Sequence, residues 1–256
     1  MSTVAVSPVE RKPAAFEPSR WFYTFTALVL LVVSVVGFQH FYFQGRAYPG
    51  RDIPPPIRTL VIAHGVIMSA WILLFATQPA LVAARGRKAH VRLGWFGVAL
   101  ACAVVVSGSM LAVQAMHIAP SEMQIWGMTP KQFLTVPLLS VAVFAGFVAV
   151  AVWKRRKPAI HRAMMLAATL AASDAAIARI DPINSLYLGT VCERVFGPFF
   201  AMLVLGVLLL AIRCAVTRSF DRWLALAVGV LFVTSALTVG VAHTDAWDAF
   251  ASSLMR

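Results

Sequence analysis

The chain has few charged residues for its length. Only 12% of its 256 residues are Asp, Glu, Lys or Arg, whereas about a quarter are charged in an average soluble domain. Hydrophobic residues make up 60% of the chain, and the mean hydropathy is +0.81. Several runs without charge approach the ~20 residues that are needed to cross the core of a bilayer. The composition therefore excludes an ordinary soluble domain and predicts a multi-pass membrane protein.

Cysteine and the common catalytic motifs are also scarce. The three cysteines, Cys102, Cys192 and Cys214, are too few and too scattered for a disulfide framework. The sequence contains no phosphate-binding GxxxxGK loop, no GxGxxG before a helix, no HExxH and no CxxC. The last hydrophobic run contains no lysine, which excludes a retinal Schiff base there. Function therefore has to be sought in isolated polar side chains inside the hydrophobic runs.

Seven hydrophobic runs predict an all-α integral membrane bundle of seven transmembrane helices. They cover 21–43, 59–84, 93–117, 132–153, 161–180, 196–213 and 223–243. The fifth contains Asp174 and Arg179, which favours a helix surrounded by other helices rather than by lipid. The predicted organisation is a disordered cytoplasmic tail over 1–20, a transmembrane domain over 21–243 and a short outer tail over 244–256.

The basic residues are unevenly distributed between the two sides of this bundle. With seven spans, 15 of the 22 Lys and Arg residues fall on the side of the N-terminus. Cytoplasmic loops are rich in Lys and Arg, so the N-terminus is predicted inside and the C-terminus outside. The formal charge of +12 is then explained by anionic lipid headgroups on the cytoplasmic side, and no nucleic-acid partner is expected. A homo-oligomer and a larger membrane complex both stay open as the assembly.

The second predicted helix carries a polar stripe. At about 100° per residue, His64, Met68, Trp71, Phe75 and Gln78 fall on one face. This face combines an imidazole, an amide and a tryptophan, so it should point into the bundle.

Asp174 is predicted to lie at the same depth as His64. Each residue is about five or six positions from the outer end of its helix, or roughly 8–9 Å below the outer interface. An ionised carboxylate is costly inside a membrane, and pairing with His64 or Arg179 would reduce that cost. We therefore expect an outward-biased polar cavity between the second and the fifth helix.

The first functional hypothesis is a redox or cofactor-handling membrane protein. In it His64 and His117 bind a b-type haem or a transition metal, and Trp71 and Gln78 complete the cofactor site. Two imidazoles from neighbouring helices are common axial ligands of haem iron, and imidazole is the commonest metal ligand.

Two alternatives stay open beside it. One is a proton-coupled transporter or small-molecule binder, in which Asp174 takes up and releases a proton while Arg179 and His64 respond. The other is a non-catalytic assembly or accessory subunit, in which the polar stripe only holds helices together.

Three sequence segments resemble a family of uncharacterised bacterial multi-pass membrane proteins. They are HGVIMSAWILLFATQPALV, then HVRLGW, then HRAMMLAATLAASDAAIAR. The matching positions are His64, Gly65, Trp71, Gln78, His90, Gly94, His161 and Arg179. The sequence departs from the family pattern at Val91 and at the extra Met of HRAMML. The resemblance implies a helical protein of the bacterial inner membrane, without an established activity.

Overall fold

The computed structural model describes residues 18–255 and is built almost entirely from helices. Seven helices of this part are 18 residues or longer, and each overlaps one of the predicted spans: α1 (Pro18–Gly37), α3 (Arg58–Ala83), α4 (Arg87–His117), α6 (Thr135–Trp153), α7 (Pro158–Ile177), α10 (Phe200–Thr217) and α11 (Arg222–Ala242). Residues 1–17 of the predicted tail lie outside the described residues. Helix α1 begins at Pro18, three residues before the predicted span.

Shorter elements connect these helices. They are α2 (Gln39–Gln44), β1 (Arg46–Tyr48), β2 (Arg51–Asp52), η1 (Pro55–Ile57), α5 (Pro130–Phe133), α8 (Asp181–Asn184), α9 (Val191–Phe196), η2 (Gly197–Phe199) and α12 (Asp245–Leu254). Strands β1 and β2 pair antiparallel. The segment predicted as a short outer tail is largely helical. Thr244 caps the start of α12, because its hydroxyl accepts from the backbone N–H of Trp247. The indole N–H of Trp247 donates to Lys131 O and so fixes α12 to α5.

Five of the helical stretches are long and apolar enough to cross a membrane, which indicates a multi-pass membrane protein. They are Pro55–Ala83, Arg87–His117, Pro130–Trp153, Val191–Thr217 and Arg222–Ala242. The apolar part of α1, Trp21–Gly37, is shorter. Helix α7 is not among the five.

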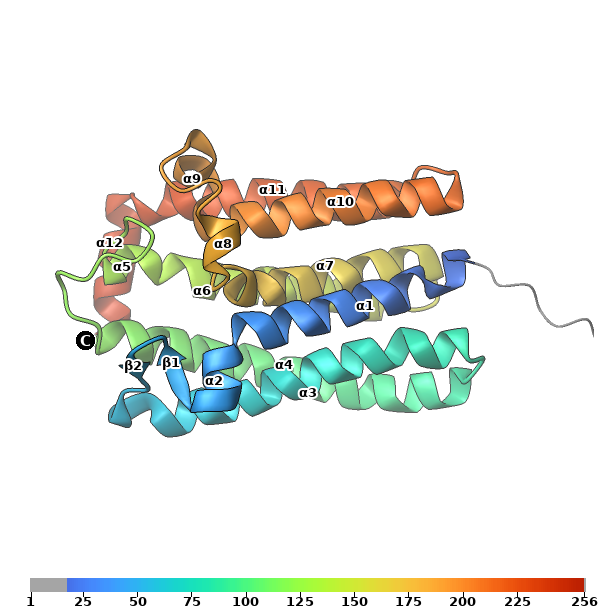
Figure 1. Cartoon of the computed structure of the whole chain (residues 1–256), viewed down its shortest axis with the longest axis horizontal. Helices are drawn as coiled ribbons and strands as arrows, with labels where there is room; N and C mark the ends of the chain where they lie inside the picture. The colour runs from blue at the N-terminus through green and yellow to red at the C-terminus, as the bar shows by residue number, and fades with distance from the viewer. Residues whose placement is uncertain (1–17, 256) are drawn as a thin grey trace, which may run out of the picture.

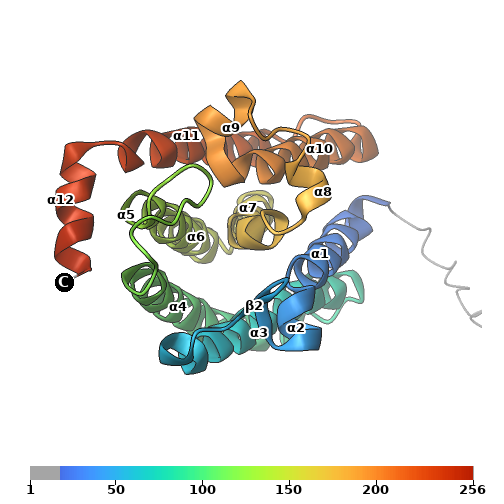
Figure 2. The ribbon, with the colours of Figure 1, turned by 60° about the vertical axis from the view of Figure 1, so that its left-hand side comes forward.

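The long helices form a ring of five with two more helices on one side. Neighbouring pairs around the ring are α1 with α3, α3 with α4, α4 with α6, α6 with α7, and α7 with α1. Helices α10 and α11 pack against α7, and α11 also packs against α6 (Figures 1 and 2). Helix α7 therefore has protein neighbours around most of its circumference, as predicted for the fifth hydrophobic run.

Small residues allow α7 to occupy this position. Ala163, Ala167 and Ala168 are fully buried in it. Close approach through small residues is typical of helix packing in membranes, where hydrocarbon chains provide no hydrophobic drive between helices. The closest approach is made by α1, where a Cβ built on Gly37 would lie 2.1 Å from the carbonyl oxygen of Ala176.

The two ends of the bundle differ in construction. The turns α3–α4, α6–α7 and α10–α11 are short and lie at the end where α1 begins, on the right in Figure 1. These turns contain Arg85, the basic run 154–157 and Arg218. The opposite end carries the β-hairpin, α5, α9 and α12. The structure thus groups the basic turns at one end, as the charge count predicts.

Candidate functional site

Asp174 is the only acidic residue in the seven long helices of residues 18–255. It lies in the second half of α7, and only 8% of the residue is exposed. The hydroxyl of Ser140 on α6 donates to its Oδ2 at 2.5 Å. The backbone N–H of Ala175 is also directed at the carboxylate. Helices α6 and α7 thus hold the carboxylate in place.

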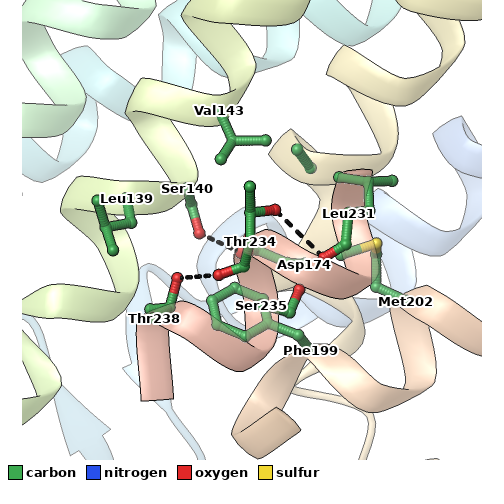
Figure 3. Close-up of a pocket in the computed structure, with 11 residues that line it drawn as sticks. Leu139, Ser140, Val143, Asp174, Phe199, Met202, Leu231, Thr234, Ser235 and Thr238 are labelled. Carbon is green, nitrogen blue, oxygen red and sulfur yellow. Dashed lines mark hydrogen bonds between the residues drawn. The ribbon is translucent and has the colours of Figure 1, made fainter. Parts of the chain in front are cut away.

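The carboxylate borders a small cavity between α6, α7, α10 and α11. Its volume is about 10 Å³, which is about the space of one water molecule. Figure 3 shows side chains of α6 and α11 gathered around Asp174. Apolar walls are provided by Leu139, Val143, Ala171, Phe199, Met202 and Leu231, and the polar residues are Ser140, Asp174, Thr234, Ser235 and Thr238.

The three hydroxyl groups of α11 that line the cavity differ in their hydrogen bonds. Thr234 donates to Val230 O at 2.8 Å, and Thr238 donates to Thr234 O at 2.7 Å, so their lone pairs stay available. Ser235 is only 4% exposed, and its hydroxyl forms no hydrogen bond within the described part of the chain. Most polar side chains of buried residues have a hydrogen-bond partner. Ser235 is therefore the feature of this cavity that packing alone does not account for.

Asp174 has no counter-ion in contact. The ion pairs among residues 18–255 are Arg46–Asp52, Lys131–Asp248 and Arg213–Asp221, and Asp174 is in none of them. Arg179 donates to Ala175 O at 2.6 Å, and its guanidinium lies 4.6 Å from the ring centroid of Phe38. The expected contact between Asp174 and Arg179 is therefore not formed.

His64 is directed at α4 and not at Asp174. Its Nδ1 lies 2.9 Å from the hydroxyl oxygen of Ser107, and that hydroxyl donates to Ala103 O at 2.6 Å. Because the serine proton is already used, Nδ1–H of His64 is the donor and Nε2 keeps its lone pair. A Cβ on Gly108 would lie 3.3 Å from the imidazole ring, so glycine makes room for it. The expected pairing of His64 with Asp174 is not formed in this arrangement.

His117 lies far from His64. Its Nδ1 is 2.8 Å from the carbonyl oxygen of Met255, beyond α12. Ser107, the partner of His64, is ten residues earlier on the same helix, or about 15 Å along the axis. A metal ion needs imidazole nitrogens at about 2.0–2.1 Å, so the structure does not bring these two histidines together as a ligand pair. Within residues 18–255, no group of three or more His, Cys, Asp or Glu side chains could hold a metal ion.

Trp71 and Gln78 also have separate environments. Trp71 is 2% exposed, packs edge-on against Phe144 at 4.9 Å between ring centroids, and borders a second cavity of about 30 Å³ between α1, α3 and α7. Gln78 lies near the other end of α3, and with its side-chain amide turned so that donors face acceptors, its nitrogen donates to Nδ1 of His90 and its oxygen accepts from Gly94 N–H. A cavity does lie beside α3 and α7, but neither His64 nor Asp174 lines it, so it is not the polar cavity that we expected around these two residues.

The stripe on α3 therefore does not form one site. His64 binds α4, Trp71 reaches the centre of the ring, and Gln78 binds the start of α4 at the basic end. There the ring of His90 lies 6.2 Å from that of His161, which donates through Nδ1 to Ala151 O. Sequence reasoning did not connect Gln78 with this pair.

Sequence reasoning also missed the hydroxyl groups of α11 that line the same cavity as Asp174. Thr234, Ser235 and Thr238 lie at spacings of one, three and four residues in an otherwise apolar helix, which places them on one face. This pattern was a usable signal that α11 presents a polar face to a neighbour. It did not reveal that the neighbour is α7.

The bond between His64 and Ser107 allows a double-mutant test. We expect the variants His64→Leu and Ser107→Ala to show a coupling free energy of roughly 0.6–1.7 kcal/mol, the range found for polar bonds between membrane helices. Thermal unfolding of the detergent-purified single and double variants measures it. Strict additivity of the two effects would show that the bond contributes nothing to packing.

Searches of family models, curated proteins and solved structures find no match to this chain. The resemblance to uncharacterised bacterial membrane proteins therefore stays a prediction, and the function has to be argued from the geometry of the site.

Proposed function

We propose that the protein is a seven-span inner-membrane protein that couples the uptake and release of a proton at Asp174 to the movement or binding of a small solute. Five long apolar helices support a membrane-spanning bundle. The basic turns lie together at one end of the bundle, and we place this end in the cytoplasm. Helices α1 and α7 supply the remaining two spans, because each packs side by side with apolar helices of the bundle.

The topology can be tested with reporter fusions. Alkaline phosphatase, which is active only outside the cytoplasm, should be active when fused after Met255 and inactive when fused after Lys88 in the α3–α4 turn. Green fluorescent protein, which matures in the cytoplasm, should give the opposite pattern. Equal signals at both positions, or the reverse pattern, would contradict the proposed orientation.

One observation carries the proposed activity. A carboxyl group is buried among helices without an ion-pair partner, and it borders a cavity whose other polar groups are all hydroxyls. Ionisable residues inside a membrane are costly and rare, and they mark proton relays and ion pathways. A carboxyl that only linked two helices would be matched by its hydrogen bonds, with no cavity and no unpartnered hydroxyl beside it.

Infrared difference spectroscopy tests whether Asp174 exchanges a proton. Spectra of the reconstituted protein recorded at acidic and alkaline pH should contain the band of a buried carboxylic acid that is lost at the higher pH. The band should be missing in Asp174→Asn and retained in Asp181→Asn, which changes an exposed acid at the start of the short helix α8. If no titrating band depends on Asp174, the proposed function fails.

The redox hypothesis receives no comparable support, since its two ligands, His64 and His117, are bound to different partners. Binding of a haem or a metal stays a prediction, and so does a role as an accessory subunit, with which the His64–Ser107 bond between α3 and α4 is compatible.

A further inference from the structure

The volume of the Asp174 cavity is that of a single small ion or water molecule. Its volume of about 10 Å³ accommodates one water-sized particle and no organic molecule. Leu139, Val143, Phe199 and Met202 line it with apolar side chains. Any solute that the protein carries must therefore bind elsewhere, and this cavity is left for a coupling ion or water.

The polar atoms in the cavity are oxygens. They are the carboxylate of Asp174 and the hydroxyl oxygens of Ser140, Thr234, Ser235 and Thr238. Hard cations prefer carboxylate, carbonyl and water oxygens over nitrogen and sulfur ligands. Because Thr234 and Thr238 donate their protons to carbonyls of α11, they offer lone pairs to the cavity. This set therefore favours a hard cation over a soft metal or an anion.

The single carboxylate in the cavity lining favours a monovalent cation. Among residues 18–255, Asp174 is the only ionisable side chain that lines the cavity, and the facing side chains of α6, α10, α11 and η2 are uncharged. Arg179 is the next charged residue along α7, and it is bound to Ala175 O. A monovalent cation would neutralise the single carboxylate, whereas a divalent cation would leave a net positive charge buried, at considerable cost.

Ser235 gives independent support for a ligand. The residue is 4% exposed and lines the cavity, and its hydroxyl forms no hydrogen bond among residues 18–255. A bound cation would supply the missing interaction. The neighbouring Ser173 on α7 offers a contrast, because its hydroxyl faces the second cavity and is bound to Thr169 O at 2.7 Å.

We infer that the cavity between α6, α7 and α11 is a sodium site, in which Asp174 and the hydroxyls of Ser140, Ser235 and the two α11 threonines hold Na⁺ in competition with the proton. This inference rests on the function proposed above and names the cation that exchanges with the proton at Asp174.

Sodium-dependent thermal stability of the detergent-purified full chain tests the inference. At pH 8 and constant ionic strength, replacing choline chloride by NaCl should raise Tm by several degrees, because a ligand that binds only the folded state stabilises it. KCl should have a smaller effect. The NaCl concentration for half the shift should rise by up to about tenfold for each pH unit on acidification, because the ligand carboxyl must lose its proton to bind a cation.

Three variants locate the site. Asp174→Asn should abolish the sodium-dependent shift, and Ser235→Ala should raise the half-maximal NaCl concentration about tenfold or more. Ser173→Ala removes a buried hydroxyl one position from Asp174, and it should retain the wild-type response. If Ser235→Ala fails to fold, Thr238→Val provides the same test at another ligand.

The outcomes separate the inference from the proposed function. No sodium-dependent shift in the wild-type protein, or a shift that persists in Asp174→Asn, overturns the sodium site. If the infrared band of Asp174 still titrates in that case, the site serves the proton alone and the proposed function stands. If neither the band nor the shift depends on Asp174, both are wrong.

Discussion

Asp174→Asn is expected to abolish ion coupling completely while leaving the fold intact or making it more stable. The amide keeps the size of the carboxylate and can still exchange a hydrogen bond with Ser140. It cannot release a proton or neutralise a cation. An ionised carboxylate inside a membrane costs up to about 2.5–3.5 kcal/mol on insertion scales, so its removal should maintain the free energy of unfolding or raise it by as much as 2–3 kcal/mol.

Parallel measurements of stability and ion response on the same samples decide this prediction. Thermal unfolding gives the stability, and the sodium-dependent shift together with the carboxyl band gives the ion response. Functional residues commonly reduce stability, so a loss of response with unchanged or higher stability is the signature of a functional residue. A variant that unfolds far more easily and keeps the ion response of the wild type would instead make Asp174 a structural link between α6 and α7.

The helical fold was largely predictable because the signal is local. Hydropathy over about 20 residues requires only that each segment be apolar, and all seven predicted spans contain a long helix. The elements that were missed depend on short-range capping and on tertiary contacts. Helix α12 is the clearest case: Thr244 caps it, and Trp247 fixes it to Lys131 of a segment more than a hundred residues earlier.

The candidate site was only half predictable, because periodicity assigns a side chain to a face and not to a neighbour. The sequence indicated that His64 and Asp174 are intramembrane polar residues at similar depth. Their partners depend on the order of helices around the ring, which places α4 beside α3 and both α6 and α11 beside α7. His64 therefore meets Ser107, and Asp174 meets Ser140. A hydroxyl in an apolar helix is a weaker sequence signal than a charge, so both partners were overlooked.

Gly37→Ala is expected to be the most destabilising conservative substitution in the ring. The added Cβ would lie 2.1 Å from the carbonyl oxygen of Ala176 and 2.8 Å from its Cα. These are backbone atoms of the central helix, so no side chain can rotate away to make room. Helix α1 would have to separate from α7, and overpacking of this kind typically costs about 1–3 kcal/mol and occasionally more. Because the obstacle is backbone, we expect about 3 kcal/mol or more.

Gly229→Ala in α11 is the matched control for this prediction. It also adds one methyl group to a long helix, but nothing lies within 4 Å of its Cβ position. Alanine is favoured over glycine inside a helix by about 1 kcal/mol, so this variant should be as stable as the wild type or slightly more stable. Opposite signs in thermal unfolding of the two purified variants would show that contact with α7, and not the loss of a flexible residue, requires glycine at position 37. Similar stability of both variants would mean that α1 packs against α7 less closely than described, and that the ring is not closed at this point.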